Sequence, residues 1–343
     1  MNNRHMPMRK QIRWTLEQLV FGGTLLPQEF TIGLAEPQAE IAVWLHGMGE
    51  PLDVTRRHSM ICAEPFTMGI AFEKNQAAGV TGLRHLSLRF CERSRPDRAL
   101  GRMSLRPVTT IEVDCLDVVL FEVRGSSNHC LPAPRLGAHY LLHAYSQWRN
   151  VDTSGIRMSF LEKHAAMVNF IRPHPVALVS VHGEEGGNLF PMNVMGELGH
   201  GYFAFGLKDN RRAAHLVERA GRLALSSVPL PQATIAFQLA ANHKKLSIDW
   251  DQLPFALKAS AEFTIPVPAF APRVRELAVK KIHRTGSHTL FVAEIVSDQR
   301  YSEIPSLHVI HGFYQAWRLK GRKEELRDSI AADASNKRGY CTS

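Results

Sequence analysis

The chain has 343 residues, of which 45% are hydrophobic and 21% are charged, and its formal net charge is +9. This composition is typical of a soluble globular protein with about two domains, and it excludes a largely disordered chain. No apolar run approaches the ~20 residues that span a membrane as a helix, and the basic stretch 1–15 lacks the apolar centre of a secretion signal.

Cysteine usage and charge narrow the class of protein further. The five cysteines are scattered and form no Cys-x-x-Cys pair, so we expect free thiols, a reducing compartment and a cytoplasmic location. Seven arginines fall between Arg84 and Arg106. No helix-turn-helix, zinc-finger or RNA-binding signature accompanies them, so we expect no nucleic-acid partner and a surface that attracts small anions such as nucleotides.

The chain begins with a lead-in over residues 1–30, in which residues 12–20 have the pattern of a short helix. A strand-like run over 42–47 then ends in His46-Gly47, and a second apolar run follows over 66–72, before Asn75. Leu120 and Phe121 lie in a later apolar run, and a Tyr-Ser-Gln-Trp-Arg string at 145–149 ends the region. A polar, turn-rich junction follows at 150–155.

The same series of features returns in the second half of the chain. His182-Gly183 matches His46-Gly47 with an offset of 136, Asn210 matches Asn75 with an offset of 135, and Leu290-Phe291 matches Leu120-Phe121. A Tyr-Gln-Ala-Trp-Arg string at 314–318 matches 145–149. A repeat of this length predicts two like domains, at 31–150 and 156–320, followed by a charged tail at 321–343. Two such domains can pair within one chain as a pseudo-dimer, and we also allow for a homodimer.

Strand signals dominate the second copy. Short runs rich in β-branched and aromatic residues, bounded by turn residues, predict strands at 176–181, 202–207, 223–228, 235–239 and 289–296. One helix is predicted over 211–220, with Asp209 or Asn210 as its N-cap and Gly221 just past its end. We therefore expect a mainly β fold, a β-barrel with short helices, and not a parallel α/β fold.

The repeat is longer in its second copy. The offset between matched residues grows from 135 at Asn210 to 169 at Trp317, so the second copy carries 34 additional residues. The proline- and aromatic-rich stretch 242–275 is the expected place for them. A long excursion from a barrel is either a lid or substrate-binding arm, or a packing flap between domains, and the sequence leaves both open.

Histidines are frequent, and two pairs lie close in sequence: His139 with His143, and His308 with His311. Neither pair has a third ligand nearby at the spacing that metal sites require, so we predict no metal. His46 and His182 follow strands at matched positions, which favours a role in stabilising turns.

Four stretches of the second copy, in this order, resemble the flavin reductase-like, FMN-binding split-barrel family. They are the strand 173–181, the turn Gly186-Gly187-Asn188, the helix start Lys208-Asp-Asn-Arg-Arg212, and the string Gly286-Ser-His-Thr-Leu-Phe-Val-Ala-Glu294. The last is the most specific of the four, and the resemblance covers about residues 170–318. The first copy resembles the family only through the second, as a degenerate copy. The implied fold is a tandem pair of FMN-binding split barrels.

The resemblance implies FMN as cofactor, NAD(P)H as co-substrate and flavin reduction by hydride transfer as the reaction. The implied cofactor-binding residues are Asn188, Phe190, Pro191, Met192, Asn193, Lys208, Asn210, Arg211 and Arg212. Arginines at a helix N-terminus suit a phosphate dianion on general grounds. His288 is the implied catalytic residue, within reach of the nicotinamide or the flavin edge; a structural role at the start of an apolar strand is the alternative.

The chain departs from the family pattern at two places. The family's Thr/Ser-Ala-Ser turn reads Met192-Asn-Val-Met-Gly196 here, and its Pro-Pro reads Gly199-His-Gly201. Asn193 is the remaining candidate for the missing hydroxyl groups. The first copy has Glu73-Lys-Asn-Gln-Ala-Ala78 in place of the arginine pair, which predicts a cofactor-poor half. A non-enzymatic flavin- or haem-binding protein, or an assembly partner, on the same scaffold stays open as an alternative.

Overall fold

The structure of the chain is a computed structural model that describes residues 29–34, 41–74, 76–80, 82–149, 158–183, 186–311 and 335–336. The predicted helix at 12–20, the predicted junction at 150–155, Asn75, and the string at 314–318 lie outside the described residues. Among the described helices, none combines the length and the apolar character needed to cross a membrane.

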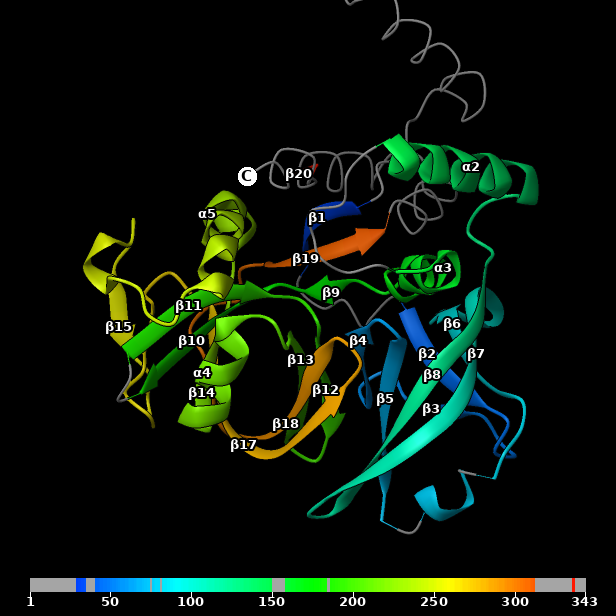
Figure 1. The fold of residues 1–343 in the computed structure, drawn as a ribbon, viewed down its shortest axis with the longest axis horizontal. Helices are drawn as coiled ribbons and strands as arrows, with labels where there is room; N and C mark the ends of the chain where they lie inside the picture. Colours follow the sequence, from blue (N-terminus) through cyan, green and yellow to red (C-terminus); the bar gives the residue numbers. More distant parts are fainter. Residues whose placement is uncertain are drawn as a thin grey trace, which may run out of the picture.

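Two seven-stranded antiparallel sheets make up most of the molecule (Figure 1). The first has the spatial order β3-β2-β6-β7-β8-β5-β4. Its strands are β2 (Ile41–His46), β3 (Leu52–Asp53), β4 (His58–Ala63), β5 (Phe66–Glu73), β6 (Leu86–Glu92), β7 (Arg95–Val113) and β8 (Leu116–Asn128). We call this sheet, residues 41–128, the first barrel.

The second sheet has the spatial order β11-β10-β14-β17-β18-β13-β12. Its strands are β10 (Ala177–Gly183), β11 (Gly186–Met192), β12 (Met195–Gly199), β13 (Tyr202–Lys208), β14 (Arg222–Ser227), β17 (Arg273–Thr285) and β18 (His288–Arg300). We call this sheet, residues 177–300, the second barrel. Taken in chain order, the strands of the two barrels occupy the same places in the two sheets. The fold is therefore mainly β, as predicted.

The two barrels share the register in which neighbouring strands pair, as well as the order of their strands. In the first barrel Gly69 pairs with Leu120 and Met68 with Phe121. In the second barrel Gly206 pairs with Leu290 and Phe205 with Phe291. The Leu-Phe pairs that the sequence matches thus lie at corresponding points of corresponding strands. Phe205 and Phe291 stack with ring centroids 5.1 Å apart inside the second barrel, whose core they help to fill.

Helices cover the barrels at their ends and join them (Figure 1). They are α2 (Ala133–Arg149), α3 (Phe160–Asn169), α4 (Arg212–Ala220) and α5 (Ala233–Gln238), with short 3-10 turns η2 (Ala77–Gly79), η3 (Leu230–Gln232), η4 (Leu239–Lys244) and η5 (Trp250–Gln252). The α3 helix begins at a capping box, in which the Ser159 hydroxyl accepts from Glu162 N and the Glu162 carboxylate accepts from Ser159 N. It packs its buried face onto the first barrel.

Two local predictions are wrong. Residues 235–239 were expected to form a strand, but they lie in α5 and the start of η4. Ala233, Ala236 and Leu239 are buried at a spacing of three, which is helical, and Pro231 opens the preceding turn. The N-cap of α4 is Arg211 and not Asp209 or Asn210. Gly221 ends α4 with φ 63°, as expected of a residue in the left-handed region.

The additional residues of the second copy connect β14 to β17 and span 228–272, so they begin earlier than the expected 242. We call them the insert. The insert contains η3, α5, η4, η5 and the small hairpin β15 (Leu257–Ala259) with β16 (Pro266–Pro268). In the first barrel the corresponding strands, β6 and β7, are joined by a two-residue turn. The insert packs on the second barrel itself, against β11 and α4.

A third sheet joins the ends of the described chain. Its order is β20-β1-β19-β9, from β20 (Ser335–Asn336), β1 (Glu29–Leu34), β19 (Ser306–His311) and β9 (His174–Pro175). Glu29 pairs with His311 and Leu34 with Ser306. The first and last long segments are therefore hydrogen-bonded to each other above both barrels (Figure 1).

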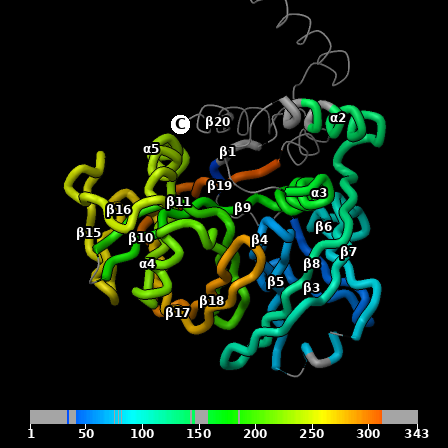
Figure 2. Tube along the Cα trace, viewed as in Figure 1, coloured from blue at the N-terminus to red at the C-terminus, as the bar shows by residue number. Residues whose placement is uncertain are grey.

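The two barrels pack directly against each other, and β4 lies beside β12, β13 and β18 (Figure 2). A buried apolar cluster with residues from both barrels, such as Ile61, Leu120 and Leu290, fills the contact. Gly206 is required there, because a Cβ atom at this position would clash with the Ile61 carbonyl oxygen. At the edge, the Tyr202 hydroxyl donates to the Asp114 carboxylate at 2.6 Å, which raises the pKa of Tyr202.

Candidate functional site

Several of the predicted site residues meet where β13 leads into α4. Lys208 ends the strand, Asn210 lies in the turn, and Arg211 and Arg212 begin the helix. Lys208 and Arg211 are half-buried, whereas Asn210 and Arg212 are exposed. The Arg211 side chain makes no capping hydrogen bond. The first turn of α4 therefore presents backbone N–H groups beside cationic side chains, which favours an anion.

Asp209 does not cap α4 because its side chain is used elsewhere. Its carboxylate accepts a hydrogen bond from the Thr289 hydroxyl, and its backbone N donates to the Ser287 carbonyl at 3.2 Å. Both partners lie at the start of β18. These bonds fix the turn before α4 onto the turn between β17 and β18, so that His288 lies opposite Lys208 in the strand register.

His288 is buried, with 3% of its surface exposed. Its Nδ1 atom lies 2.9 Å from the Ser287 hydroxyl and 3.6 Å from Cys62 Sγ in the first barrel. Burial and, to a smaller extent, the positive charge of Lys208 lower the pKa of His288 to about 4, although Asp209 opposes them. The imidazole is therefore neutral near pH 7 and can hold a hydrogen bond without carrying charge.

The first barrel contributes a turn to this region. Glu64 precedes the β5 strand, and its carbonyl oxygen accepts from Ser287 N at 2.9 Å. Gly286 lies against the same carbonyl with φ +54°, and a Cβ atom there would clash with it. The turn that carries His288 is thus held in the contact between the barrels, and its position depends on both of them.

The predicted residues at 188–193 lie in three different environments. Phe190 and Met192 are buried in the core of the second barrel, so their side chains face inward. Pro191 and Asn193 are half-buried on the alternate positions. Asn188 is fully buried and holds the insert, because its side-chain amide donates to the carbonyl oxygens of Asn242 and Lys245 at 2.9 and 2.7 Å.

His243, on η4 of the insert, was not predicted as a site residue. Its Nε2 atom lies 2.8 Å from the Pro191 carbonyl oxygen, and its ring packs on Phe190 with centroids 4.6 Å apart. Burial lowers its pKa, the hydrogen bond opposes this, and the charges of Arg211 and Lys208 add to the lowering. The insert has no counterpart in the first copy, so the repeat gave no signal for His243.

The structure therefore brings together Pro191, Lys208, Arg211 and His288, with Asn210 and Arg212 at the exposed edge. It places Asn188, Phe190 and Met192 in structural contacts. The cationic side chains at the end of β13 and the start of α4 can hold a phosphate group.

Comparison with known proteins identifies one domain family. Residues 171–315 match the family described as "Flavin reductase like domain". No curated protein matches the chain. The match covers less than half of the chain and includes the whole second barrel, the insert and β19.

Three solved structures resemble part of the chain. The FMN-binding protein from Thermus thermophilus with bound p-hydroxybenzaldehyde is 24% identical, with 44% of this chain and 81% of that chain covered and a TM-score of 0.35. The NADH:FAD oxidoreductase from Streptomyces globisporus C-1027 is 17% identical, with 48% and 94% covered and a TM-score of 0.39. The styrene monooxygenase flavin reductase from Pseudomonas putida S12 is 20% identical, with 43% and 93% covered and a TM-score of 0.35.

Proposed function

Since residues 171–315 form a flavin reductase-like domain, we propose that the protein binds FMN and reduces it with NAD(P)H. The observation that carries the proposal is this family match, together with the cationic start of α4 inside the matched region. FMN itself requires a phosphate site, a platform for the ring and hydrogen bonds to the ring edge.

Arg211, Arg212 and Lys208 would hold the phosphate. The arginine side chains offer forked donors that fit phosphate oxygens, and the uncapped first turn of α4 adds backbone N–H groups. Asn193 and the backbone of 191–193 would face the ring edge. Asn188, Phe190 and Met192 would act through the backbone of β11, because their side chains are occupied in the insert contact and the core.

Bound FMN would supply the acceptor atom for a hydride from nicotinamide, so the protein need not provide a strong acid or base. His288 would hold its neighbours in place as a neutral imidazole, through Ser287 and across to Cys62. Lys208, opposite His288, would bring positive charge to the anionic ligand. The barrel contact would keep this group of residues in one arrangement.

The matching strand order of the two barrels supports a tandem duplication, in which the halves pair as a pseudo-dimer. The first barrel has the short turn η2 where the second has α4. Glu73, at the equivalent strand end, pairs with Arg57 and His200. An acidic group there disfavours a phosphate, which supports a single cofactor site per chain.

The experiment is a titration of the purified full chain with FMN, followed by flavin fluorescence and the visible spectrum, and then by NADH and NADPH oxidation. We expect quenching with half-saturation below tens of micromolar, equivalent to at least about 6 kcal/mol of binding free energy. FMN binding without NAD(P)H oxidation would indicate a flavin carrier. A haem spectrum, or no interaction with FMN, would refute the proposal.

A further inference from the structure

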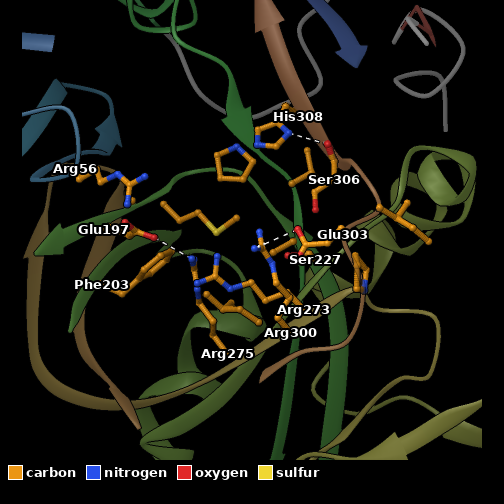
Figure 3. A pocket seen from close by; sticks show the side chains of 18 of the residues that line it. Arg56, Glu197, Phe203, Ser227, Arg273, Arg275, Arg300, Glu303, Ser306 and His308 are labelled. Atoms are coloured by element: carbon orange, nitrogen blue, oxygen red, sulfur yellow. Dashed lines mark hydrogen bonds and ion pairs between the residues drawn. The ribbon is translucent and has the colours of Figure 1, made fainter. Parts of the chain in front are cut away.

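A separate cavity of about 190 Å³ opens on the second barrel where β10 begins and β14 ends (Figure 3). It is lined by five arginines, Arg56, Arg172, Arg273, Arg275 and Arg300, and by the carboxylates of Glu197 and Glu303. Arg56 comes from the first barrel, so both barrels contribute charge to the cavity.

The carboxylates of the cavity are already paired. Arg275 binds Glu197 at 2.8 Å and Arg300 binds Glu303 at 3.2 Å. Asp298, just beyond the lining, pairs with Arg273 and Arg275. Figure 3 shows Arg56 and Arg275 on either side of Glu197. Five guanidinium groups therefore line the cavity, and the two carboxylates that line it with them, Glu197 and Glu303, are already paired.

Arg172 is the unusual member of the group. Only 6% of its surface is exposed, and its Nε atom has no hydrogen-bond partner among the described residues. Burial lowers the pKa of Arg172 to about 10, which is still high enough to keep the guanidinium charged near pH 7. A buried cation without a full set of acceptors is costly, and an anion in the cavity would remove that cost.

The neighbouring histidines add no positive charge to the cavity near pH 7. Burial, followed by the charge of Arg172, lowers the pKa of His174 to about 3. Burial also lowers the pKa of His308, in the cavity wall, to about 4, although its hydrogen bond to the Ser306 carbonyl opposes this. Both imidazoles are neutral near pH 7, so the positive charge of the cavity comes from its arginines.

We propose that this cavity binds a small phosphate-bearing anion, with the buried Arg172 guanidinium as its central contact. A phosphate group carries several oxygens, which can accept from several forked guanidinium groups at once. A single water molecule needs about 10–15 Å³ of such a cavity, so about 190 Å³ is room for a group much larger than water. It accommodates inorganic phosphate or the phosphate end of a small ester, and not a whole dinucleotide.

The cavity is distinct from the phosphate site proposed at α4. The β13 strand carries Phe203 in the cavity wall and Lys208 five residues later, a separation of about 17 Å at ~3.4 Å per residue. The β18 strand likewise begins at His288, opposite Lys208, and reaches the cavity through Arg300 at its other end. One chain would therefore hold two anions at opposite ends of the second barrel.

The test uses the full chain at pH 7.5 and constant ionic strength, with sodium chloride replaced stepwise by inorganic phosphate, glycerol 3-phosphate or succinate. We expect a saturable rise in Tm with inorganic phosphate or the phosphate ester, half-complete at about 1 mM or below. The tighter of the two identifies the source of the phosphate group. A response to succinate alone, or no saturable response to either phosphate, overturns the proposal.

Arg172→Met tests the central contact. We expect phosphate affinity to fall roughly 10- to 100-fold, the loss of one or two charge-assisted hydrogen bonds. Without phosphate, Tm should be unchanged or higher, because an apolar side chain replaces a buried charge. Arg284→Met is the control, because Arg284 is exposed at the end of β17 that lies away from the cavity, and this variant should respond to phosphate as the unchanged chain does.

Ser227→Asp gives an independent test if Arg172→Met does not fold. Ser227 lines the cavity at the end of β14, and a carboxylate there would offset one positive charge. Phosphate affinity should again fall by 10-fold or more, while FMN titration stays as it was. Undiminished phosphate binding in a folded Arg172→Met or Ser227→Asp variant overturns the assignment.

Discussion

Burial and nearby cations together lower the pKa values of four histidines in the second half. Burial is the largest cause for His288 and His243; Lys208 then adds to the lowering at His288, and Arg211 and Lys208 add to it at His243. Burial is also the largest cause for His174 and His308, with Arg172 adding to the lowering. Cationic side chains can thus concentrate at two places on the barrel without competition from imidazolium groups, and an anionic ligand meets arginine and lysine alone.

At the proposed phosphate site, the double change Arg211→Ala and Arg212→Ala should weaken FMN binding by roughly 2–4 kcal/mol, since charge-assisted bonds contribute about 1.5–3 kcal/mol each and are not additive. Riboflavin, which lacks the phosphate, should lose far less. Fluorescence titration with both ligands measures the difference. Equal losses for the two would place the arginines at another part of the ligand.

Acid should destabilise the protein through its buried histidines. Their folded pKa values, about 3 for His174 and about 4 for His288 and His308, lie below the value of ~6.5 in the unfolded chain. Between these values the unfolded chain binds protons that the folded chain does not. The free energy of unfolding should therefore fall as pH drops below about 6.5, by on the order of 3 kcal/mol per histidine, and level off near pH 4.

Urea denaturation between pH 7.5 and 4.5 measures this fall. His308→Gln removes one titrating group and should make the dependence shallower. His215→Gln, on the exposed face of α4, is the matched control and should leave the dependence unchanged. A His308→Gln variant as sensitive to acid as the unchanged chain would contradict the assignment.

Among the elements, the insert explains why Asn188 has a structural role in addition to the cofactor-binding role predicted from the sequence. Asn188 lies in the predicted flavin segment, yet its amide bonds hold η4 against β11. The Asn242 amide returns a bond to the Leu189 carbonyl at 2.9 Å. This reciprocal pair ties the insert to the barrel at a fully buried point, where unsatisfied polar groups are costly.

Asn188→Ala should therefore destabilise the protein by about 1–3 kcal/mol, because it removes the side-chain hydrogen bonds to Asn242 and Lys245 at a largely buried point. The insert should become more sensitive to limited proteolysis and to hydrogen exchange over 228–272. Asn193→Ala is the matched comparison: Asn193 is half-buried, and we expect its loss to weaken FMN binding with little effect on stability. Protection of the insert that is unchanged in Asn188→Ala would refute the anchoring role.

The elements that the sequence predicts best are those with a strong local pattern. The structure contains the predicted strands at 176–181 and 202–207 and the predicted helix end at Gly221. Both kinds of signal, a short run of strand-forming residues and a glycine in the left-handed region, are contained within a few neighbouring residues. Residues 235–239 have the composition of a strand, yet their burial at a spacing of three is set by the barrel beneath them. Composition alone cannot report that contact.

At the scale of the whole molecule, the barrel contact depends on glycines that allow backbones to approach. Gly206→Ala should clash with the Ile61 carbonyl oxygen and force the barrels apart. We expect a loss of at least about 2 kcal/mol in the free energy of unfolding, comparable to overpacking a core. Gly125→Ala, in β8 with no atom within 4 Å of the added carbon, is the control and should change stability by less than about 0.5 kcal/mol.

The sequence repeat predicts two like domains, and the two seven-stranded sheets share one strand order, but no sequence pattern predicts the third sheet. Its strand β1, Glu29–Leu34, crosses the expected boundary between the lead-in and the first domain, and it pairs with β19 of the other half. No local pattern in residues 29–34 indicates which distant segment pairs with this strand. For the same reason Arg172 and Arg56, far apart in sequence, gave no sign that they line one cavity.

The pairing of β1 with β19 also sets an order of events during protein synthesis. Glu29–Leu34 leaves the ribosome about 270 residues before Ser306–His311, which at ~5–20 residues per second is a delay of roughly 15–55 s. The first barrel can close in that interval, but β1 must wait as an unpaired edge open to other chains. The last step of folding is thus the joining of the earliest strand to one of the latest, and a nascent chain stalled between the barrels is exposed to association through β1.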